Sequence, residues 1–202
     1  FLRASGRLAQ YLTENVHQTA AGLTLLSARL PSCQSASWAA EQPALSDRAY
    51  RAVNKAQALI TETKYGEANA KLQEALSGAG ERVYDKGVIL QTLGFVAAQQ
   101  EKYGQATKYF ADAIATGGLP QPVAQQVRYN LAQLYMAEGN FKGSISTMNP
   151  WFASLGKDEK PTPHAYITLA NAHVQLKQYR EAIPAVDQAI KLSAGKAPES
   201  WY

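Results

Sequence analysis

The stretch KYGQATKYFADAI, residues 102–114, combines an aromatic ring, a small residue and a bulky apolar residue in a fixed order. Three related stretches occur in the chain, KYGEANAKLQEAL from Lys64, NFKGSISTMNPWF from Asn140 and QYREAIPAVDQAI from Gln178. Their first rings follow one another at intervals of 38 residues, and they are Tyr65, Tyr103, Phe141 and Tyr179. Because chance does not keep such an interval constant, the sequence predicts stacked structural repeats.

The spacing inside each stretch predicts an α-helix. A small residue follows the ring after three positions, a bulky apolar residue comes four positions later, and a further packing residue comes three positions after that. Spacings of three and four residues place all of these side chains on one helical face. The small residues are Ala68, Ala106, Ser144 and Ala182, the bulky ones are Leu72, Phe110, Met148 and Val186, and the last are Ala75, Ala113, Trp151 and Ala189.

A second amphipathic segment precedes each of these predicted helices. In GVILQTLGFVAAQQ, residues 87–100, the pattern consists of Leu90, Leu93, Gly94 and Ala97. The small residue in this pattern lets the two helices of one unit approach closely. Matching positions in the other copies are Leu131, Ala132 and Tyr135, then Tyr166, Leu169, Ala170 and His173, and in the most divergent copy Ala52, Lys55, Ala56 and Leu59.

This pattern of a large residue, Leu-Gly, a ring, and then small and bulky residues resembles the tetratricopeptide repeat, a helix–turn–helix unit of about 34 residues. The resemblance implies an all-α, right-handed α-solenoid over residues 45–202, with the extra residues of the 38-residue period lying between units. It implies units at about 49–82, 87–120, 125–158 and 163–196, and a fifth that begins near residue 198 with Trp201 as its first large residue.

Residues 1–44 differ from the rest of the chain. An apolar stretch, residues 20–30, precedes the small residues Ser37 and Ala39, a pattern typical of the end of a secretory signal peptide. Cys33 in LPSC offers a lipoprotein version of the same interpretation, and a poorly ordered or mistranslated leader is the alternative. The missing initiator Met and the ending PESWY predict that both ends are cuts through a longer protein.

Composition and charge exclude several classes of protein. Apolar residues make up 46% of the 202 residues and charged residues 18%, so a buried core is expected and global disorder is not. The net charge of +4 comes with no adjacent Lys or Arg, which disfavours nucleic-acid binding. No apolar run approaches the roughly 18 residues needed to span a bilayer.

The sequence predicts no enzyme, cofactor or metal site. It contains no Gly-rich phosphate loop, no HExxH and no nucleophile elbow. A single cysteine excludes an intrachain disulfide and a cysteine-based zinc site. His164 and His173 are separated by about 900° of helical rotation and therefore lie on opposite faces. By register, His173 is expected to be a core residue with its hydrogen bonds satisfied.

The resemblance also implies a binding site for a protein or peptide, because the first helices of tetratricopeptide repeats line a concave groove. The Lys of the carboxylate clamp found in chaperone-binding members is absent here, so we expect an uncharged or mildly apolar peptide segment. The alternative is a solvated, amide-rich face that binds nothing. By register the groove residues are Gln91, Phe95, Gln99, Gln126, Tyr129, Gln133, Met136, His164, Ile167, Asn171 and Gln175.

Two prolines fall inside predicted second helices. Pro184 lies near its helix start and is expected only to kink the helix, whereas Pro150 is expected to end its helix early. Trp151 and Phe152 then belong either to a locally repacked joint or to an exposed docking patch.

These observations favour a non-enzymatic interaction scaffold. Segments such as LQTLGFVAAQQEKYGQA and APESWY further resemble bacterial envelope proteins with tetratricopeptide repeats that are associated with TonB-type energy transduction. That resemblance implies an exported periplasmic adaptor. The alternatives are a cytoplasmic scaffold, a regulatory or substrate-presenting domain of a protein extending past Tyr202, and self-assembly into homodimers through the end repeats.

Overall fold

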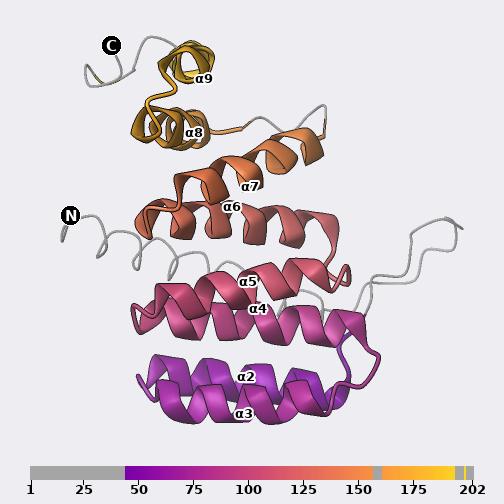
Figure 1. Ribbon diagram of the computed structural model, residues 1–202. Coiled ribbons are helices and arrows are strands. Elements are labelled where there is room, and N and C mark those ends of the chain that lie inside the picture. The colour runs from indigo at the N-terminus through magenta and orange to yellow at the C-terminus, as the bar shows by residue number, and fades with distance from the viewer. Residues whose placement is uncertain (1–43, 157–160, 194–197, 199–202) are drawn as a thin grey trace, which may run out of the picture. The chain divides into compact units, whose positions relative to one another are not determined.

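The computed structural model describes residues 44–156, 161–193 and 198, and this part of the chain is helical without any β-strand (Figure 1). The chain divides into two compact units, one that ends at Pro120 and one that begins at Gln121. Unit 1 contains α2 (Asp47–Thr61), α3 (Tyr65–Ser77), α4 (Val83–Gln99) and α5 (Tyr103–Ala115). Unit 2 contains α6 (Gln121–Ala137), α7 (Phe141–Ser154), α8 (Pro163–Gln175) and α9 (Tyr179–Leu192).

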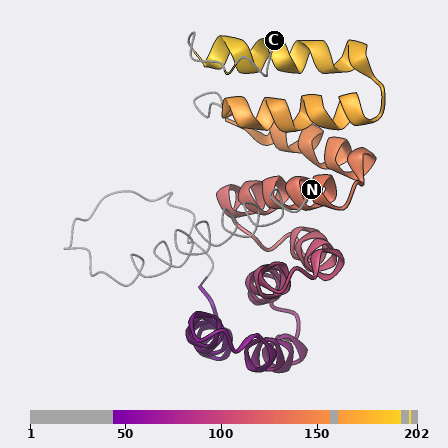
Figure 2. The same cartoon turned by 90° about the vertical axis from the view of Figure 1, so that its left-hand side faces the viewer.

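The helices form consecutive hairpins, in which a first helix packs on the second helix that follows it in the chain. Figure 2 views α2 to α5 of unit 1 nearly along their axes, so that the alternation of first and second helices is visible. Each second helix begins at one of the four rings from which the period was measured, namely Tyr65, Tyr103, Phe141 and Tyr179. The all-α repeat fold expected from the sequence is therefore confirmed.

The two helices of each hairpin are joined by the same three-residue turn. Its middle residue adopts a left-handed conformation, with φ between +57° and +74°, and only one of the four copies is a glycine. The next amide donates to the carbonyl five residues earlier, over 2.8 to 3.0 Å, as in a Schellman motif. The left-handed residues are Thr63, Glu101, Gly139 and Lys177, again 38 positions apart.

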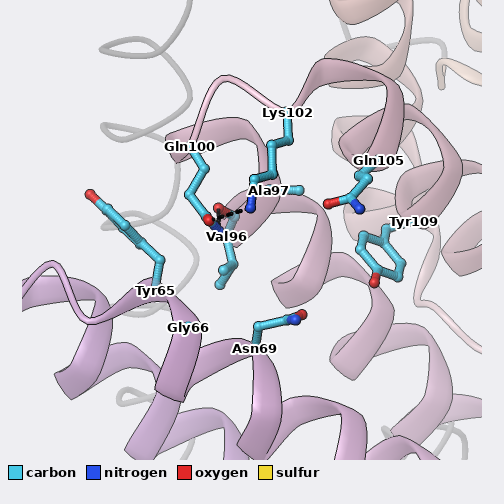
Figure 3. A pocket seen from close by; sticks show the side chains of 9 residues that line it. All are labelled: Tyr65, Gly66, Asn69, Val96, Ala97, Gln100, Lys102, Gln105 and Tyr109. Atoms are coloured by element: carbon cyan, nitrogen blue, oxygen red, sulfur yellow. Dashed lines mark hydrogen bonds between the residues drawn. The ribbon is translucent and has the colours of Figure 1, made fainter.

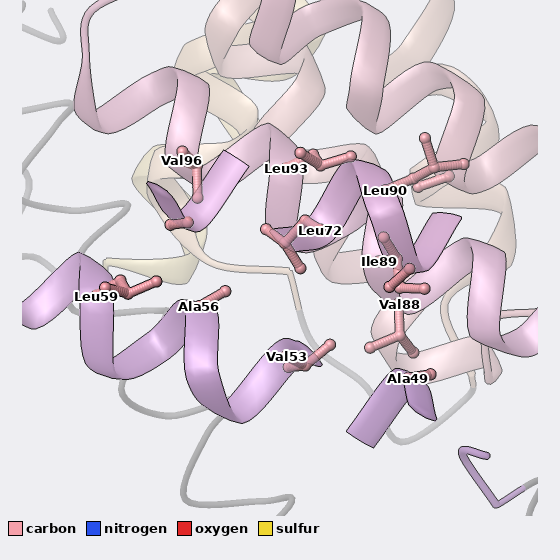
Figure 4. Close-up of a cluster of buried hydrophobic side chains, with 13 residues drawn as sticks. Ala49, Val53, Ala56, Leu59, Leu72, Val88, Ile89, Leu90, Leu93 and Val96 are labelled. Carbon is pink, nitrogen blue, oxygen red and sulfur yellow. The ribbon is translucent and has the colours of Figure 1, made fainter. Parts of the chain in front are cut away.

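The core of unit 1 is a continuous apolar cluster contributed by α2, α3, α4 and α5 (Figure 4). Its fully buried members include Leu72 of α3 and both Ile89 and Leu93 of α4. α4 is the most enclosed helix described, since nearly all of its residues between Asp85 and Ala98 are buried. Its burial on several sides explains why its sequence is apolar almost throughout.

The close approach of α4 to α5 depends on one missing side chain. A Cβ atom placed on Gly94 would lie 2.6 Å from two ring atoms of Phe110, closer than van der Waals contact permits. The ring of Phe110 is completely buried and meets the ring of Phe95 edge to face, with centroids 5.1 Å apart. The predicted pairing of a small residue with a bulky one is thus the contact that holds this hairpin together.

Unit 2 contains a series of aromatic contacts that connects three of its helices. Tyr129 of α6 contacts Trp151 of α7, Trp151 contacts Phe152, and Phe152 stacks on Tyr166 of α8. The ring centroids along this series are 4.7 to 5.1 Å apart. Since Trp151 is only 9% exposed, it belongs to a repacked joint and not to an exposed docking patch.

The expectation that Pro150 ends its helix early is wrong. α7 continues for four residues beyond it to Ser154, although proline removes one backbone donor and crowds the preceding turn. Trp151 lies at the centre of the aromatic series, and this packing offsets the local cost of the proline. Pro184 also lies within a continuous helix, α9.

Some expectations concern residues that the structure does not describe. Nearly all of the leader, residues 1–44, and the residues that would open a fifth unit at Trp201 lie outside the described ranges. Among the helices that are described, none is both long enough and apolar enough to cross a membrane.

We expect Phe110→Ala to lower the free energy of unfolding by about 3–5 kcal/mol, because it leaves a cavity in the core. Gly94→Ala should lower it by about 1–3 kcal/mol through overpacking against the same ring. Urea unfolding followed by far-ultraviolet circular dichroism measures both changes.

Tyr50→Ala provides the control for these two variants, since Tyr50 is 51% exposed. It should change the free energy of unfolding by no more than about 0.5 kcal/mol. A Phe110→Ala protein as stable as the Tyr50→Ala protein would show that the α4–α5 contact is not what stabilises the hairpin.

Candidate functional site

All eleven residues expected in a binding groove lie on the first helices α4, α6 and α8. Within each unit, the first helices of successive hairpins touch, since α2 contacts α4 and α6 contacts α8. Side chains at matching register on these neighbours therefore lie on adjacent strips of surface. The eleven residues divide between the two units, and each unit is described by itself.

In unit 1 the predicted groove residues contribute mainly to packing. Gln91 and Phe95 of α4 are each 5% exposed, and Gln99 is half-buried. The ring of Phe95 is held against Phe110 of α5, so it anchors the hairpin. The sequence pattern could not separate this packing role from a binding role, because α4 is apolar on nearly every face.

On α6 of unit 2 the predicted residues are partly accessible. Tyr129 is 8% exposed, and its ring packs against Trp151 with centroids 5.1 Å apart. Gln126, Gln133 and Met136 are half-buried. The amide of Gln126 donates to the Oδ1 atom of Asn130 over 3.0 Å, which fixes the orientation of the Gln126 side chain.

α8 is the first helix whose predicted residues face outward. His164, Asn171 and Gln175 are exposed and Ile167 is half-buried. Their spacings of three, four and four residues place them along one helical face. Other faces of α8 carry the buried alanines that pack in unit 2, namely Ala165, Ala170 and Ala172.

We refer to the accessible groove positions of unit 2 as the amide surface. Its four carboxamides each offer two donors and one acceptor oxygen, so they can pair with peptide N–H and C=O groups alike. None of its members carries a carboxylate, an ammonium or a guanidinium group. The amide surface consists of Gln126, Gln133, Met136, His164, Ile167, Asn171 and Gln175.

His173 lies elsewhere on α8 and is not the core residue expected from its register. Its ring is half-buried, and its Nδ1 atom lies 2.9 Å from the Oε1 atom of Gln178 in the following turn. In residues 44–156, 161–193 and 198, no three His, Cys, Asp or Glu side chains are grouped as a metal site would require.

The most buried carboxylate described, Asp85, connects α4 to the start of α2. It is 1% exposed and accepts hydrogen bonds from the backbone N–H and the hydroxyl of Ser46, and from the Nε atom of Arg82. Burial by itself raises the pKa of Asp85, but the hydrogen bonds from Ser46 and the charge of Arg82 outweigh it and lower the pKa below its usual value.

Ser46 is also the N-cap of α2, since its hydroxyl oxygen accepts a hydrogen bond from the amide of Ala49. Arg82 extends the same network by donating to the carbonyl of Ala44. Each of these hydrogen bonds of Asp85 therefore joins it to a residue that holds the start of α2 in place. We assign this carboxylate a structural role.

A cavity lies between α3, α4 and α5 in unit 1, and none of the predicted groove residues is among those that line it. Its polar side chains come from second helices and from the turn before α5, whereas the sequence pattern predicts binding residues on first helices. The repeats differ in sequence beside this cavity, because Glu62 in one copy of the turn corresponds to Gln100 in the next copy.

Comparison with known proteins identifies the repeat. A family model described as tetratricopeptide repeat matches residues 92–149, and a second model with the same description matches residues 163–195. None of the curated proteins compared with the chain matches it in sequence.

Several solved structures share the fold. MamA from residue 41 to its end, of Desulfovibrio magneticus RS-1, has a TM-score of 0.60 and 18% identity, with 75% of this chain and 78% of that chain covered. A tetratricopeptide repeat protein of Parabacteroides merdae has a TM-score of 0.62 and 15% identity, with 77% and 57% covered. PilF of Pseudomonas aeruginosa has a TM-score of 0.53 and 19% identity, with 73% and 62% covered.

We expect Asp85→Asn to lower the free energy of unfolding at pH 7 by about 1.5–3 kcal/mol, because the hydrogen bonds to a charged acceptor are lost. Since folding lowers the pKa of Asp85, the ionised carboxylate stabilises the folded protein fully at pH values above its unfolded pKa of about 3.9. The contribution is lost as the pH falls through the folded value. Thermal melts between pH 7 and pH 2 measure both effects.

The stability difference between the wild-type and Asp85→Asn proteins should therefore shrink below about pH 4. Asp112→Asn is the matched control, because its carboxylate is half-exposed and lies 3.5 Å from Lys108. That variant should stay within about 0.5 kcal/mol of wild type at pH 7. A difference for Asp85→Asn that persists unchanged at acidic pH would contradict the assigned network.

Proposed function

Since this chain is a tetratricopeptide-repeat protein, we propose that it is an interaction scaffold that binds an extended protein segment on the amide surface of unit 2. Tetratricopeptide repeats generally mediate protein–protein interactions, and members of the family are generally scaffolds without catalytic activity. Repeat arrays suit this role because neighbouring units present matching side chains at regular intervals.

The observation that carries this proposal is the outward-facing row on α8. A helix packed on one side by α9 and on another by α7 keeps three polar side chains exposed along a single face. The neighbouring α6 supplies Gln126 and Gln133 at the same register. Two adjacent strips of carboxamides offer more hydrogen-bonding positions than one helix provides.

The chemistry of the amide surface favours an uncharged segment. A carboxylate or ammonium buried against it would lose hydration without gaining an opposite charge from any of its members. Peptide groups, in contrast, find both donors and acceptors in the amides of Asn171 and Gln175. Met136 and Ile167 add apolar contacts that select for apolar side chains in the bound segment.

We further propose that the scaffold works in the envelope of a Gram-negative bacterium. The apolar residues 20–30 and the small residues Ser37 and Ala39 support an export signal that is cleaved after Ala39. The resemblance to envelope proteins associated with TonB-type systems agrees with this location.

We expect the chain, expressed from residue 1 behind an initiator Met in a Gram-negative host, to appear in the periplasmic fraction with Ala40 as its first residue. Ala39→Arg should block this processing, because signal cleavage requires a small residue there. Ala36→Gln, outside the two small positions, should still be processed. Cell fractionation and mass spectrometry of the purified chain decide, and an intact leader on a cytoplasmic wild-type protein would exclude export.

For the amide surface, we expect Asn171→Ala combined with Gln175→Ala to weaken the binding of a selected peptide by about tenfold. Two lost hydrogen bonds of about 0.5–1.5 kcal/mol each give an effect of this size. The peptide is first selected by the wild-type protein from a displayed library of unstructured peptides. Fluorescence anisotropy with the labelled peptide then gives the Kd.

Asp187→Ala combined with Gln188→Ala is the matched control, since these residues are exposed on α9 outside the amide surface. The control should bind the peptide as wild type does, and circular dichroism should show equal helicity in all three proteins. Equal affinity of the Asn171→Ala, Gln175→Ala protein and the wild type would exclude the amide surface as the binding site.

A further inference from the structure

We propose that the cavity between α3, α4 and α5 is a second binding site, specific for a carboxylate group of side-chain size. Figure 3 shows Asn69 of α3, Gln105 and Tyr109 of α5, and Lys102 of the preceding turn around its opening. Val96 and Ala97, near the end of α4, supply its apolar part. It lies among second helices and is separate from the amide surface.

The size of the cavity limits what it can hold. Its volume is about 80 Å³, measured as the space open to the centre of a water molecule. One buried water needs roughly 10–15 Å³ by the same measure. The cavity therefore accommodates a side-chain carboxylate or one end of a small dicarboxylic acid, but not a helix.

Lys102 is the cation of the site; its side chain is exposed and is oriented by one hydrogen bond. Its Nζ atom donates to the Oε1 atom of Gln100 over 2.8 Å, while the Nε2 atom of Gln100 donates to the carbonyl of Val96 over 3.0 Å. Gln100 thus keeps its oxygen turned toward the ammonium. Because an ammonium has three donor hydrogens, two of them remain for a ligand.

The other polar groups around the cavity can also donate. The Oη atom of Tyr109 accepts a hydrogen bond from Gln73 over 2.8 Å, so its own proton is available to another acceptor. The carboxamides of Asn69 and Gln105 make no side-chain hydrogen bond within the part of the chain that the structure describes. Among residues 44–156, 161–193 and 198, no carboxylate lines the cavity. The lining therefore offers several donors, one positive charge and no negative charge.

The repeat itself shows what is unusual about this charge. In the preceding copy of the turn, 38 residues earlier, Lys64 is paired with Glu62 over 2.8 Å. Position 62 corresponds to position 100, where the acid is replaced by glutamine. The ammonium of Lys102 consequently has an amide neighbour in the place where the ammonium of Lys64 has a carboxylate.

The carboxylate of a ligand would take the role beside Lys102 that Glu62 has beside Lys64. It would accept charge-assisted hydrogen bonds from Lys102 and neutral ones from Asn69 and Gln105. The nearby acids Glu67 and Glu101 are exposed and do not line the cavity, so they screen the site without filling it. A neutral amide of the same shape would lack the charge interaction.

The experiment is a titration of isotopically labelled full-length protein, followed by the side-chain amide signals in its NMR spectrum. Glutarate is the free-acid probe, an N-acetylated and C-amidated peptide with a single Glu is the protein-like probe, and glutaramide is the neutral control. We expect glutarate or the Glu peptide to shift the signals of Asn69, Gln100 and Gln105 in a saturable manner, and glutaramide to leave them unchanged.

Two substitutions test the charge directly. Lys102→Gln removes the ammonium. Gln100→Glu supplies an internal carboxylate that should form an ion pair with Lys102, as Glu62 does with Lys64. Each should weaken binding of the responding probe by at least about tenfold while leaving the helicity unchanged. Lys64→Gln, at the same register but already paired with an acid, should bind the probe as wild type does.

Saturable shifts with glutarate alone assign the site to a free small acid, and tighter binding of the Glu peptide assigns it to an acidic side chain of a partner. The proposal is overturned if neither probe gives a saturable shift, if glutaramide shifts the same signals equally, or if Gln100→Glu binds with wild-type affinity. The Asn171→Ala, Gln175→Ala protein should bind the probe normally, so failure at this site is distinguishable from failure at the amide surface.

Discussion

The structure depends on the contact between a small residue on each first helix and a bulky residue on the second helix that follows. In the second hairpin this contact is the ring of Phe110 lying where Gly94 has no side chain. The same pairing places Ala132 beside α7 and Ala170 beside α9, both nearly completely buried. Because the approach of two helices is set by the smallest residue between them, these positions determine the spacing of the two helices within each hairpin. Larger side chains elsewhere adapt to it, as the aromatic series around Trp151 shows.

The features that repeat with a fixed period were predictable from the sequence. The rings Tyr65 and Tyr103 mark the starts of α3 and α5 because the pattern of apolar residues reports local geometry directly. The course of α7 was not predictable, since the penalty for Pro150 is local while the packing of Trp151 involves α6. The left-handed residues were also missed. Only Gly139 carries the usual signal, and Thr63, a β-branched residue, occupies the same position in another copy.

The exposure of the predicted groove positions follows the register on α8 but not on α4. On α8 the register separates exposed Asn171 from buried Ala170, and the sequence indicates this difference correctly. α4 is buried on nearly every face, so the same register gives Gln91 and Phe95 at 5% exposure. The carboxylate site has a different kind of signal, because it depends on how Gln100 departs from its counterpart Glu62. In repeat proteins, conformity between copies reports the fold, and departures from it point to individual sites.

The hairpin turns have a consequence for how such an array can diversify. A Cβ atom on Gly139 would meet no other atom within 4 Å, so the only penalty at this position comes from the backbone dihedral angles. Thr63, Glu101 and Lys177 carry that penalty while Gly139 avoids it. Neighbouring hairpins can therefore differ in rigidity through a residue that touches neither the core nor either proposed ligand. Exchanging Gly139 or Lys177 would then change the order in which the hairpins open, with no change to the residues of either proposed site.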